Sequence, residues 1–187
     1  EYVFVYRPPE RQHITSLPLE DDSLKIQIYD DFIIDLRKNY SLLVSGSSGA
    51  GKSYSTYFIV SRFISQTVCG RHAKIFVIDP KMSDIYKLCQ LSGIPVSNYG
   101  TTNEDAFRIV RRYLKEMERR MIIYNESDLF DSIAIDLGLP PLLLVIEEYS
   151  SLVASMDIKG KKDFENMVGV IAQKARSLSM GVCIVMQ

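Results

Sequence analysis

The chain has 187 residues, of which 47% are hydrophobic and 24% charged, and its formal net charge is -1. This length suits one domain, and the composition excludes wholesale disorder. The balanced charge excludes the broad basic surface of a domain that binds duplex nucleic acid over a whole face, so any such contact must be local. The three widely spaced cysteines favour neither a disulfide framework nor a paired-cysteine zinc site, and they fit a reducing cytoplasm.

Residues 1–39 are predicted to form an N-terminal strand and connector region that leads into a core at 40–187. The alternating run at 2–6 favours a short strand, and the prolines and acidic cluster after it favour a connector. Residues 24–28 are a second candidate strand, and 31–36 a short packing segment. No apolar run approaches the roughly 20 residues that span a bilayer, so we expect a soluble piece of a longer protein.

Short, nearly continuous apolar runs in the core are typical of strands that are covered on both faces. Helical patterns lie between them, the first over 52–68, and residues 125–141 are predicted to be a loop with a helical turn. Buried strands that alternate with amphipathic helices predict an α/β fold with a parallel sheet flanked by helices. The strand candidates are 41–45, 74–79, 142–147 and 182–186, and the two helical stripes are Phe107, Val110, Leu114, Met117, Met121 and Tyr124, and Phe164, Met167, Val168, Ile171, Ala175 and Leu178.

A phosphate-binding motif, G-x-x-x-x-G-K-[ST], follows the first of these strands and opens the first helix. Small residues let backbone N–H groups close around phosphates, and the helix directs its positive end at them. Lys52 is expected to reach the β and γ phosphates of ATP, and Ser53 to hold Mg²⁺. A Gly/Ser-rich turn is the simpler alternative, which both flanking elements disfavour. The predicted nucleotide-binding residues are Gly46, Ser47, Ser48, Gly49, Ala50, Gly51, Lys52, Ser53 and Tyr54.

The apolar run at 142–147 ends in two carboxylates, Glu147 and Glu148. In a phosphate-loop enzyme the first positions Mg²⁺ and the second activates the attacking water, and we assign the pair these roles. The alternative is a solvated charge pair at a strand end. Asp is usual at the metal position, and the extra methylene of Glu147 calls for a water-mediated contact or a shifted backbone. This departure bears on hydrolysis and leaves the prediction of nucleotide binding unchanged.

These stretches together resemble the FtsK/SpoIIIE family of hexameric motor ATPases, which drive double-stranded DNA through a central pore. The resemblance covers roughly 40–187 and implies a RecA-like phosphate-loop ATPase with further strands beyond Gln187. The Glu–Glu pair and the long connection at 177–180 are departures that resemble divergent members from conjugative elements of Gram-positive bacteria. Besides the phosphate loop, the stretches are 77–81 (VIDPK), 113–120 (YLKEMERR), the acidic strand, and 171–176 (IAQKAR) leading into 181–187 (GVCIVMQ).

The resemblance also implies roles for single residues. Gln187 is interpreted as a sensor of the γ phosphate, with a plain strand-end amide as the alternative. Arg176 is a candidate arginine finger that reaches a neighbouring subunit's nucleotide, or else a surface charge at a helix end. Asp79 and Lys81 resemble a turn near the nucleotide, although a simple strand-to-helix turn is the competing interpretation.

A basic cluster is expected on the helix with the first stripe, largely opposite its apolar side. Because acidic residues lie within helical reach of it, a solvated or subunit-facing surface is favoured over a DNA groove. The cluster comprises Arg108, Arg111, Arg112, Lys115, Arg119 and Arg120.

Three functions remain open on this sequence. The first is an ATP-driven double-stranded DNA translocase or conjugation coupling protein that assembles as a ring, with six subunits expected from the resemblance. It would be held at the inner face of a bacterial membrane by segments outside this chain. The second is a type VII-like protein-secretion ATPase. The third is a nucleotide-binding assembly subunit with weak hydrolysis, which the Glu147 departure motivates.

Overall fold

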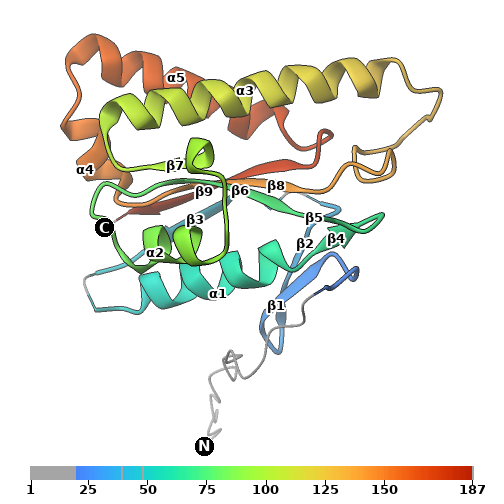
Figure 1. The fold of residues 1–187 in the computed structure, drawn as a ribbon, viewed down its shortest axis with the longest axis horizontal. Helices are drawn as coiled ribbons and strands as arrows, with labels where there is room; N and C mark the ends of the chain where they lie inside the picture. Colours follow the sequence, from blue (N-terminus) through green and yellow to red (C-terminus); the bar gives the residue numbers. More distant parts are fainter. Residues whose placement is uncertain (1–19, 39, 48, 187) are drawn as a thin grey trace, which may run out of the picture.

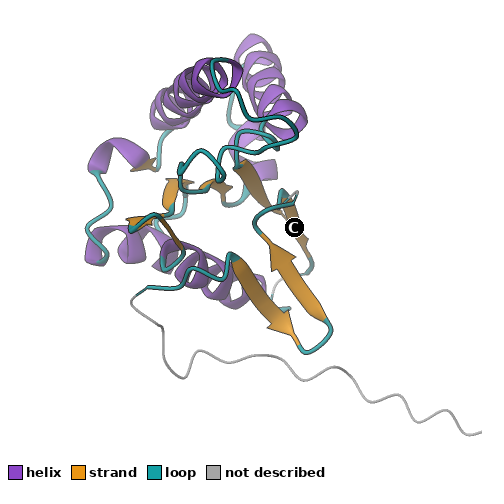
Figure 2. Ribbon diagram, turned by 90° about the vertical axis from the view of Figure 1, so that its right-hand side faces the viewer, coloured by secondary structure: helices purple, strands orange, loops and turns teal. Residues whose placement is uncertain are grey.

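The computed structural model describes residues 20–38, 40–47 and 49–186. At its centre is a parallel sheet with the strand order β3-β9-β8-β6-β7. Helices cover both faces, as Figures 1 and 2 show, so the predicted α/β fold is confirmed. The strands are β3 (Leu42–Ser45), β6 (Lys74–Ile78), β7 (Tyr99–Gly100), β8 (Leu142–Ile146) and β9 (Met180–Met186).

The helices divide between the two faces of the sheet. On one side lie α1 (Lys52–Ile64) and α2 (Asp84–Leu91), and on the other α3 (Asn103–Asn125) and α5 (Ile158–Lys174). The six-residue helix α4 (Tyr149–Ala154) follows β8. The remaining elements are the antiparallel pair β1 (Lys25–Tyr29) and β2 (Phe32–Asp35), the antiparallel pair β4 (Thr67–Val68) and β5 (Arg71–His72), and the 3₁₀ turn η1 (Val96–Asn98).

Alternate residues of the buried strands belong to two separate hydrophobic clusters. Ile75 and Val77 of β6 join the cluster beneath α1, which also includes buried residues of β1 and β2. Phe76 and Ile78 join the cluster beneath α3 and α5. This period of two explains why the strands read as continuous apolar runs, since both faces are buried.

The predicted strands agree with the structure within two residues, but the first helix is shorter than predicted. Residues 52–68 were expected to be helical, whereas α1 ends at Ile64 and Thr67–Val68 forms β4. Cys69 and Gly70 both have positive φ, 49° and 69°, which is the conformation of a two-residue hairpin turn. This turn pairs β4 with β5, so that Thr67–Val68 forms a strand instead of the last residues of the helix.

Several elements were not foreseen. The packing segment expected at 31–36 is strand β2, paired with β1, and α2, β7 and α4 had no predicted counterpart. Residues 126–141 hold turns and no α-helix or strand, which agrees with the predicted loop. The strand predicted at 2–6 lies outside the described residues, and the division at residue 39 stays a prediction.

The long helix α3 is rotated from the predicted stripe. Ile109 and Tyr113 are fully buried, whereas Met121 is 37% exposed. Arg120, expected on the basic surface, is 2% exposed. Its guanidinium donates to the carbonyls of Leu178 at 2.8 Å and Pro140 at 2.7 Å, so its place in the basic surface cluster was wrong. The carbonyl groups that face α3 satisfy the buried charge.

We expect Gly181→Ala in β9 to destabilise the fold by about 1 to 3 kcal/mol, because a Cβ there would lie 2.6 Å from the ring atoms Cδ2 and Cε2 of Tyr40. Tyr40 is 2% exposed and has little room to move. The free energy of unfolding in urea measures the effect. Gly169→Ala in α5 is the control, since its Cβ meets nothing within 4 Å. Equal stability of the two variants would contradict the steric argument.

No helix within the described part of the chain combines the length and the apolar character needed to cross a bilayer.

Candidate active site

The phosphate-binding motif forms a loop between β3 and α1. Gly49 and Gly51 have φ of 79° and 82°, in the left-handed region that glycine adopts without strain. The Ala50 N–H donates to the carbonyl of Ser47 at 3.2 Å and closes the loop. Gly51 is the N-cap of α1, so the positive end of the helix dipole faces the phosphate loop. The sequence therefore builds an anion site from backbone alone.

The ammonium group of Lys52 lies across this loop. Its Nζ donates to the carbonyl of Gly46 at 2.6 Å and to that of Ser47 at 2.9 Å. The charge is thereby held where phosphate oxygens would arrive. An ammonium group has three N–H donors, so these two bonds leave one for a phosphate oxygen. Contact with both the β and γ phosphates requires that one carbonyl give way to an anionic acceptor, which forms a stronger charge-assisted bond.

The two carboxylates at the end of β8 face the loop across a cavity of about 380 Å³. The neighbouring strand β9 separates β8 from β3, so the phosphate loop and the acidic strand end meet at the carboxyl edge of the sheet. This is the usual place for ligand binding in open α/β sheets. The cavity is lined by Gly49, Gly51, Lys52, Ser53, Lys81, Glu147, Glu148, Val185 and Met186.

Glu147 is almost completely buried, with 6% of its surface exposed. Burial raises its pKa from 4.5 to about 7, and the negative charges of Asp79 and Glu148 add to the shift, while Lys52 and Lys81 oppose it. Its Oε1 atom is buried without a hydrogen-bond partner. A buried oxygen acceptor that has no donor calls for a proton or a cation.

These residues fit Mg²⁺, which prefers hard oxygen ligands and is commonly held by one or two carboxylates together with substrate phosphates. Glu147 supplies the carboxylate, and Ser53 lines the same cavity. Within the described residues, no group of three or more His, Cys, Asp or Glu side chains could hold a metal ion. A Mg²⁺ ion at this site would complete its ligands with the phosphates of a bound nucleotide.

Glu148 is held by a lysine from the turn that follows the neighbouring strand β6. It has φ 50° and ψ 42°, a left-handed turn that ends β8 and starts α4. Lys81 Nζ lies 2.8 Å from its Oε1. The turn that carries Lys81 is fixed by buried Asp79, whose carboxylate accepts from the Ser83 N–H at 2.7 Å and the Ser83 hydroxyl at 2.8 Å. Asp79 thus shapes the turn, and Lys81 reaches the site.

The raised pKa of Glu147 predicts a pH-dependent stability without metal or nucleotide. Between the unfolded pKa near 4.5 and the folded pKa near 7, the folded chain binds the extra proton, so the free energy of unfolding falls as pH rises through this window. The expected fall is about 3 kcal/mol. Urea unfolding at a series of pH values measures it, and Glu147→Gln should abolish this component. Parallel curves for the two proteins would contradict the assignment.

The structure brings together most of the predicted site. Gly49, Gly51, Lys52, Ser53, Glu147 and Glu148 line one cavity. Gly46, Ser47 and Ala50 belong to the loop beside it, whereas Tyr54 lies on α1, is 41% exposed and is not part of the lining. Lys81 was predicted to lie in a turn near the nucleotide, or in a simple strand-to-helix turn, without a role in the site; its place after β6, next to β8 in the sheet, was the available signal. Ser48 and Gln187 lie outside the described residues.

Arg176 lies away from this cavity in its own chain. It is exposed and follows α5, four residues before β9 begins, so it stands at the amino ends of the strands. The site lies at their carboxyl ends. A catalytic role for Arg176 therefore requires a neighbouring subunit and stays a prediction.

A parallel sheet with a glycine-rich phosphate loop facing an acidic strand end defines a P-loop NTPase. A family model described as the FtsK/SpoIIIE family matches residues 15–186, and the chain belongs to this family. A protein named DNA translocase FtsK from Borreliella burgdorferi is 27% identical over an alignment of 171 residues that covers 84% of this chain and 21% of that protein. The DNA translocase SftA of Bacillus subtilis is 27% identical over an alignment of 164 residues that covers 83% of this chain and 17% of that protein.

Solved structures share the fold. The monomer form of TcpA, a conjugation coupling protein of pCW3, with ATPγS superposes with a TM-score of 0.70 at 19% identity, covering 90% of this chain and 49% of that one. EssC from Geobacillus thermodenitrificans gives 0.68 at 19% identity, covering 98% of this chain and 37% of that one. The chain spans about a fifth of the length of the curated relatives it matches.

Proposed function

We propose that this chain is the ATP-hydrolysing motor domain of a DNA translocase. One observation carries the proposal: in a member of the FtsK/SpoIIIE family, the phosphate loop, Lys52, Ser53 and two carboxylates converge on one cavity. Simple nucleotide storage would need the loop but not two acidic side chains opposite it. Their presence supports turnover.

Each group has a distinct role in this proposal. The loop N–H groups and the Lys52 ammonium bind the phosphates of ATP and offset their charge. Ser53 and Glu147 hold Mg²⁺, which supplies charge neutralisation at the transferring phosphoryl group when bound. Glu148 accepts the proton of the attacking water. Gln187 senses the γ phosphate.

The assembly is proposed from the relatives. Proteins named DNA translocases match most of this chain, which supports DNA as the substrate. The double-stranded form is the expectation from the family resemblance. A ring, six-membered in the expectation from the family, would bring Arg176 of one subunit to the site of the next. The protein would act in conjugative transfer or DNA segregation. Segments outside this chain would hold it at the cytoplasmic face of a membrane.

The deciding experiment is the ATPase rate of the whole protein with and without double-stranded DNA. We expect stimulation by DNA, and we expect Lys52→Ala to reduce hydrolysis by at least about 10²-fold because it removes the cation that stabilises charge on the transferring phosphate. Lys87→Ala on α2 is the matched control, since its ion pair with Asp84 lies on the surface. Undiminished hydrolysis by the Lys52→Ala variant would contradict the assignment of the active site.

A second candidate is a protein-secretion ATPase. A type VII secretion ATPase, EccC of Thermomonospora curvata, superposes over 92% of this chain with a TM-score of 0.62 at 20% identity, covering 22% of that one. An assembled protein that hydrolyses ATP but ignores DNA would favour this candidate. Nucleotide binding without turnover in the assembled protein would instead favour an assembly subunit with weak hydrolysis.

A further inference from the structure

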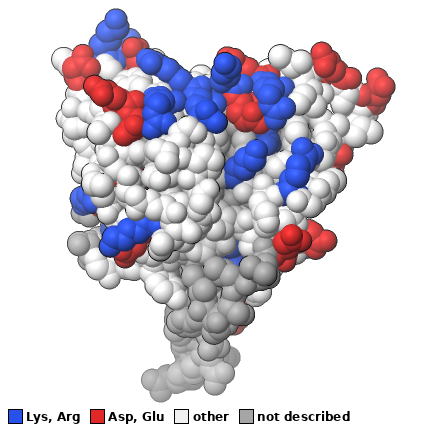
Figure 3. Space-filling model, in the orientation of Figure 1, with Lys and Arg blue, Asp and Glu red and all other residues white. Residues whose placement is uncertain are grey.

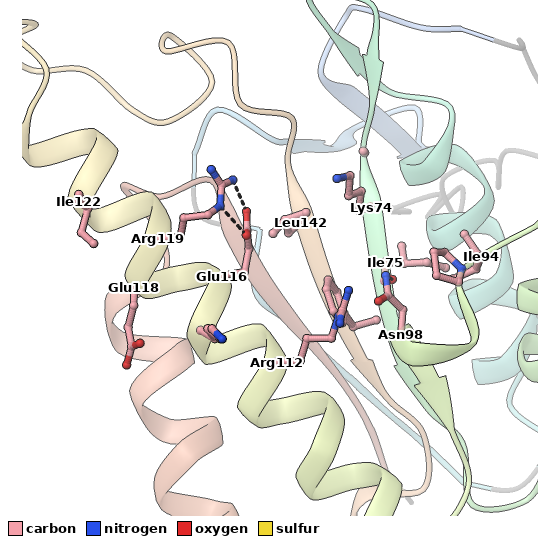
Figure 4. Close-up of a pocket in the computed structure, with 14 residues that line it drawn as sticks. Lys74, Ile75, Ile94, Asn98, Arg112, Glu116, Glu118, Arg119, Ile122 and Leu142 are labelled. Carbon is pink, nitrogen blue, oxygen red and sulfur yellow. Dashed lines mark hydrogen bonds and ion pairs between the residues drawn. The ribbon is translucent and has the colours of Figure 1, made fainter.

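A second and larger cavity lies on another part of the molecule. Its volume is about 710 Å³, within the range of ligand sites. It runs between β6, α3 and the segment around η1, as Figure 4 shows, and none of its lining residues lines the candidate active site. We refer to it as the β6 groove. Its floor is formed by Ala73, Lys74, Ile75, Phe76 and Leu142.

The floor of the β6 groove includes an open strand edge. On one side β6 pairs with β8 along all of Lys74–Ile78, but on the other β7 pairs only with Val77 and Ile78. Residues 74–76 therefore extend past the end of β7. At about 3.3 Å per residue, this leaves roughly 10 Å of strand edge beside the groove.

The backbone of Ile75 is directed at this edge. The Lys74 N–H donates to the carbonyl of Pro141, on the β8 side, and successive residues of a strand direct their amide groups to opposite sides. The Ile75 carbonyl accepts from Asn98 Nδ2 at 3.4 Å, longer than the usual 2.7 to 3.2 Å. A better-placed donor can replace this contact.

The two walls of the β6 groove differ in chemistry. Ile94 and Pro95 form an apolar wall on the side of α2. The wall from α3 carries Arg112, Lys115 and Arg119, and Figure 3 shows Lys and Arg side chains gathered over this helix among acidic ones. Glu116 on the same wall is bound to Arg119 and Arg120. No ion pair among the described residues involves Lys74, Arg112 or Lys115.

We propose that the β6 groove binds an extended acidic segment of a partner protein, which adds to the sheet as a strand beside Ile75. A strand in this place presents alternate side chains to the two walls. Carboxylates at every second position meet Arg112 and Lys115, while apolar residues between them meet Ile94 and Pro95. Main-chain hydrogen bonds supply affinity, and the two walls supply specificity.

A peptide fits these features better than a nucleic acid does. The backbone N–H and carbonyl of Ile75 can pair with a peptide backbone, and the apolar wall has no counterpart on a phosphate backbone. Because the groove and the candidate active site share no residue, binding here does not depend on the proposed ATPase function.

The test uses the full chain and a fluorescein-labelled peptide with Glu and Val at alternate positions. Anisotropy gives the affinity, and hydrogen exchange should slow in the segment at 73–77. The double variant Arg112→Glu/Lys115→Glu should weaken binding at least about tenfold. Arg111→Glu, on the same helix but outside the groove, should not. Circular dichroism checks that each variant is folded.

Two N-methylated peptides separate strand addition from simple charge attraction. Methylation of the Val amides and methylation of the Glu amides block opposite edges of the added strand. One of the two peptides should lose binding and the other should keep it. Retained binding by both, or equal affinity for a peptide with Lys in place of Glu, would overturn the proposal. So would a DNA duplex that competes with the peptide and protects the same segment.

Discussion

Replacing Glu148 by Gln is expected to slow ATP hydrolysis by about 10²- to 10⁴-fold, with little change in Mg-ATP affinity. Gln keeps the shape and the acceptor oxygen of the side chain but cannot take a proton. The left-handed turn at the end of β8 carries this carboxylate into the cavity beside Lys52 and Ser53, and Lys81 holds it there at 2.8 Å. The substitution therefore removes the chemistry of one group and leaves the phosphate loop intact.

Single-turnover hydrolysis and binding of a fluorescent ATP analogue measure the two quantities separately. Glu165→Gln on α5 is the matched control, because this exposed carboxylate lies outside the cavity. Glu147→Gln should instead weaken Mg²⁺-dependent binding, since Glu147 is the buried carboxylate with the unsatisfied oxygen. If Glu148→Gln weakened metal binding and left the chemical step unchanged, the two roles would have to be exchanged.

Local sequence determined much of the candidate site. The motif at 46–53 needs glycine at Gly49 and Gly51 because both adopt positive φ, and the flanking strand and helix follow from their own hydrophobic patterns. Glu147 and Glu148 were found because they follow an apolar strand directly. Lys81 was missed as a site residue because its contact with Glu148 joins the ends of two strands that are distant in sequence and adjacent in the sheet.

The missed elements have physical explanations too. β7 has only two residues, and it is a strand because it pairs with β6. No local sequence pattern indicates this pairing. The end of α1 was missed although Ser65, Gln66 and Thr67 are polar. Thr67–Val68 forms a strand because the turn at Cys69 and Gly70 pairs it with β5. Pairing partners and turn geometry are set by the tertiary structure, which a single sequence encodes only indirectly.

Arg120 shows a case in which periodicity and residue type disagree. It lies three residues after buried Met117 and seven after buried Tyr113, so helical spacing places it on the core side of α3. Its charge favoured the surface, and this interpretation was wrong. The partners that make burial possible are the carbonyls of Pro140, Leu178 and Ser179, which lie in loops before β8 and β9. Their position could not be read from the helix.

We expect Arg120→Ala to lower the free energy of unfolding by about 3 to 5 kcal/mol, because it leaves buried carbonyls without a donor and removes a partner of Glu116. Whole domains have stabilities of about 5 to 15 kcal/mol, so this loss would bring the chain close to unfolding. Urea denaturation followed by circular dichroism measures it. The free energy of unfolding of Arg120→Lys should lie between those of Arg120→Ala and the unchanged protein, since one ammonium group cannot reproduce the planar guanidinium that reaches several carbonyls.

The neighbouring Arg119 provides the control, because it pairs with the same Glu116 but its side chain is 52% exposed. Arg119→Ala should cost less than about 1 kcal/mol. The bonds of Arg120 join α3 to the amino ends of β8 and β9, opposite the phosphate loop. Folded Arg120→Ala protein should therefore bind ATP normally at low temperature. Equal losses of stability for the two alanine variants would show that the buried guanidinium does not hold these elements together.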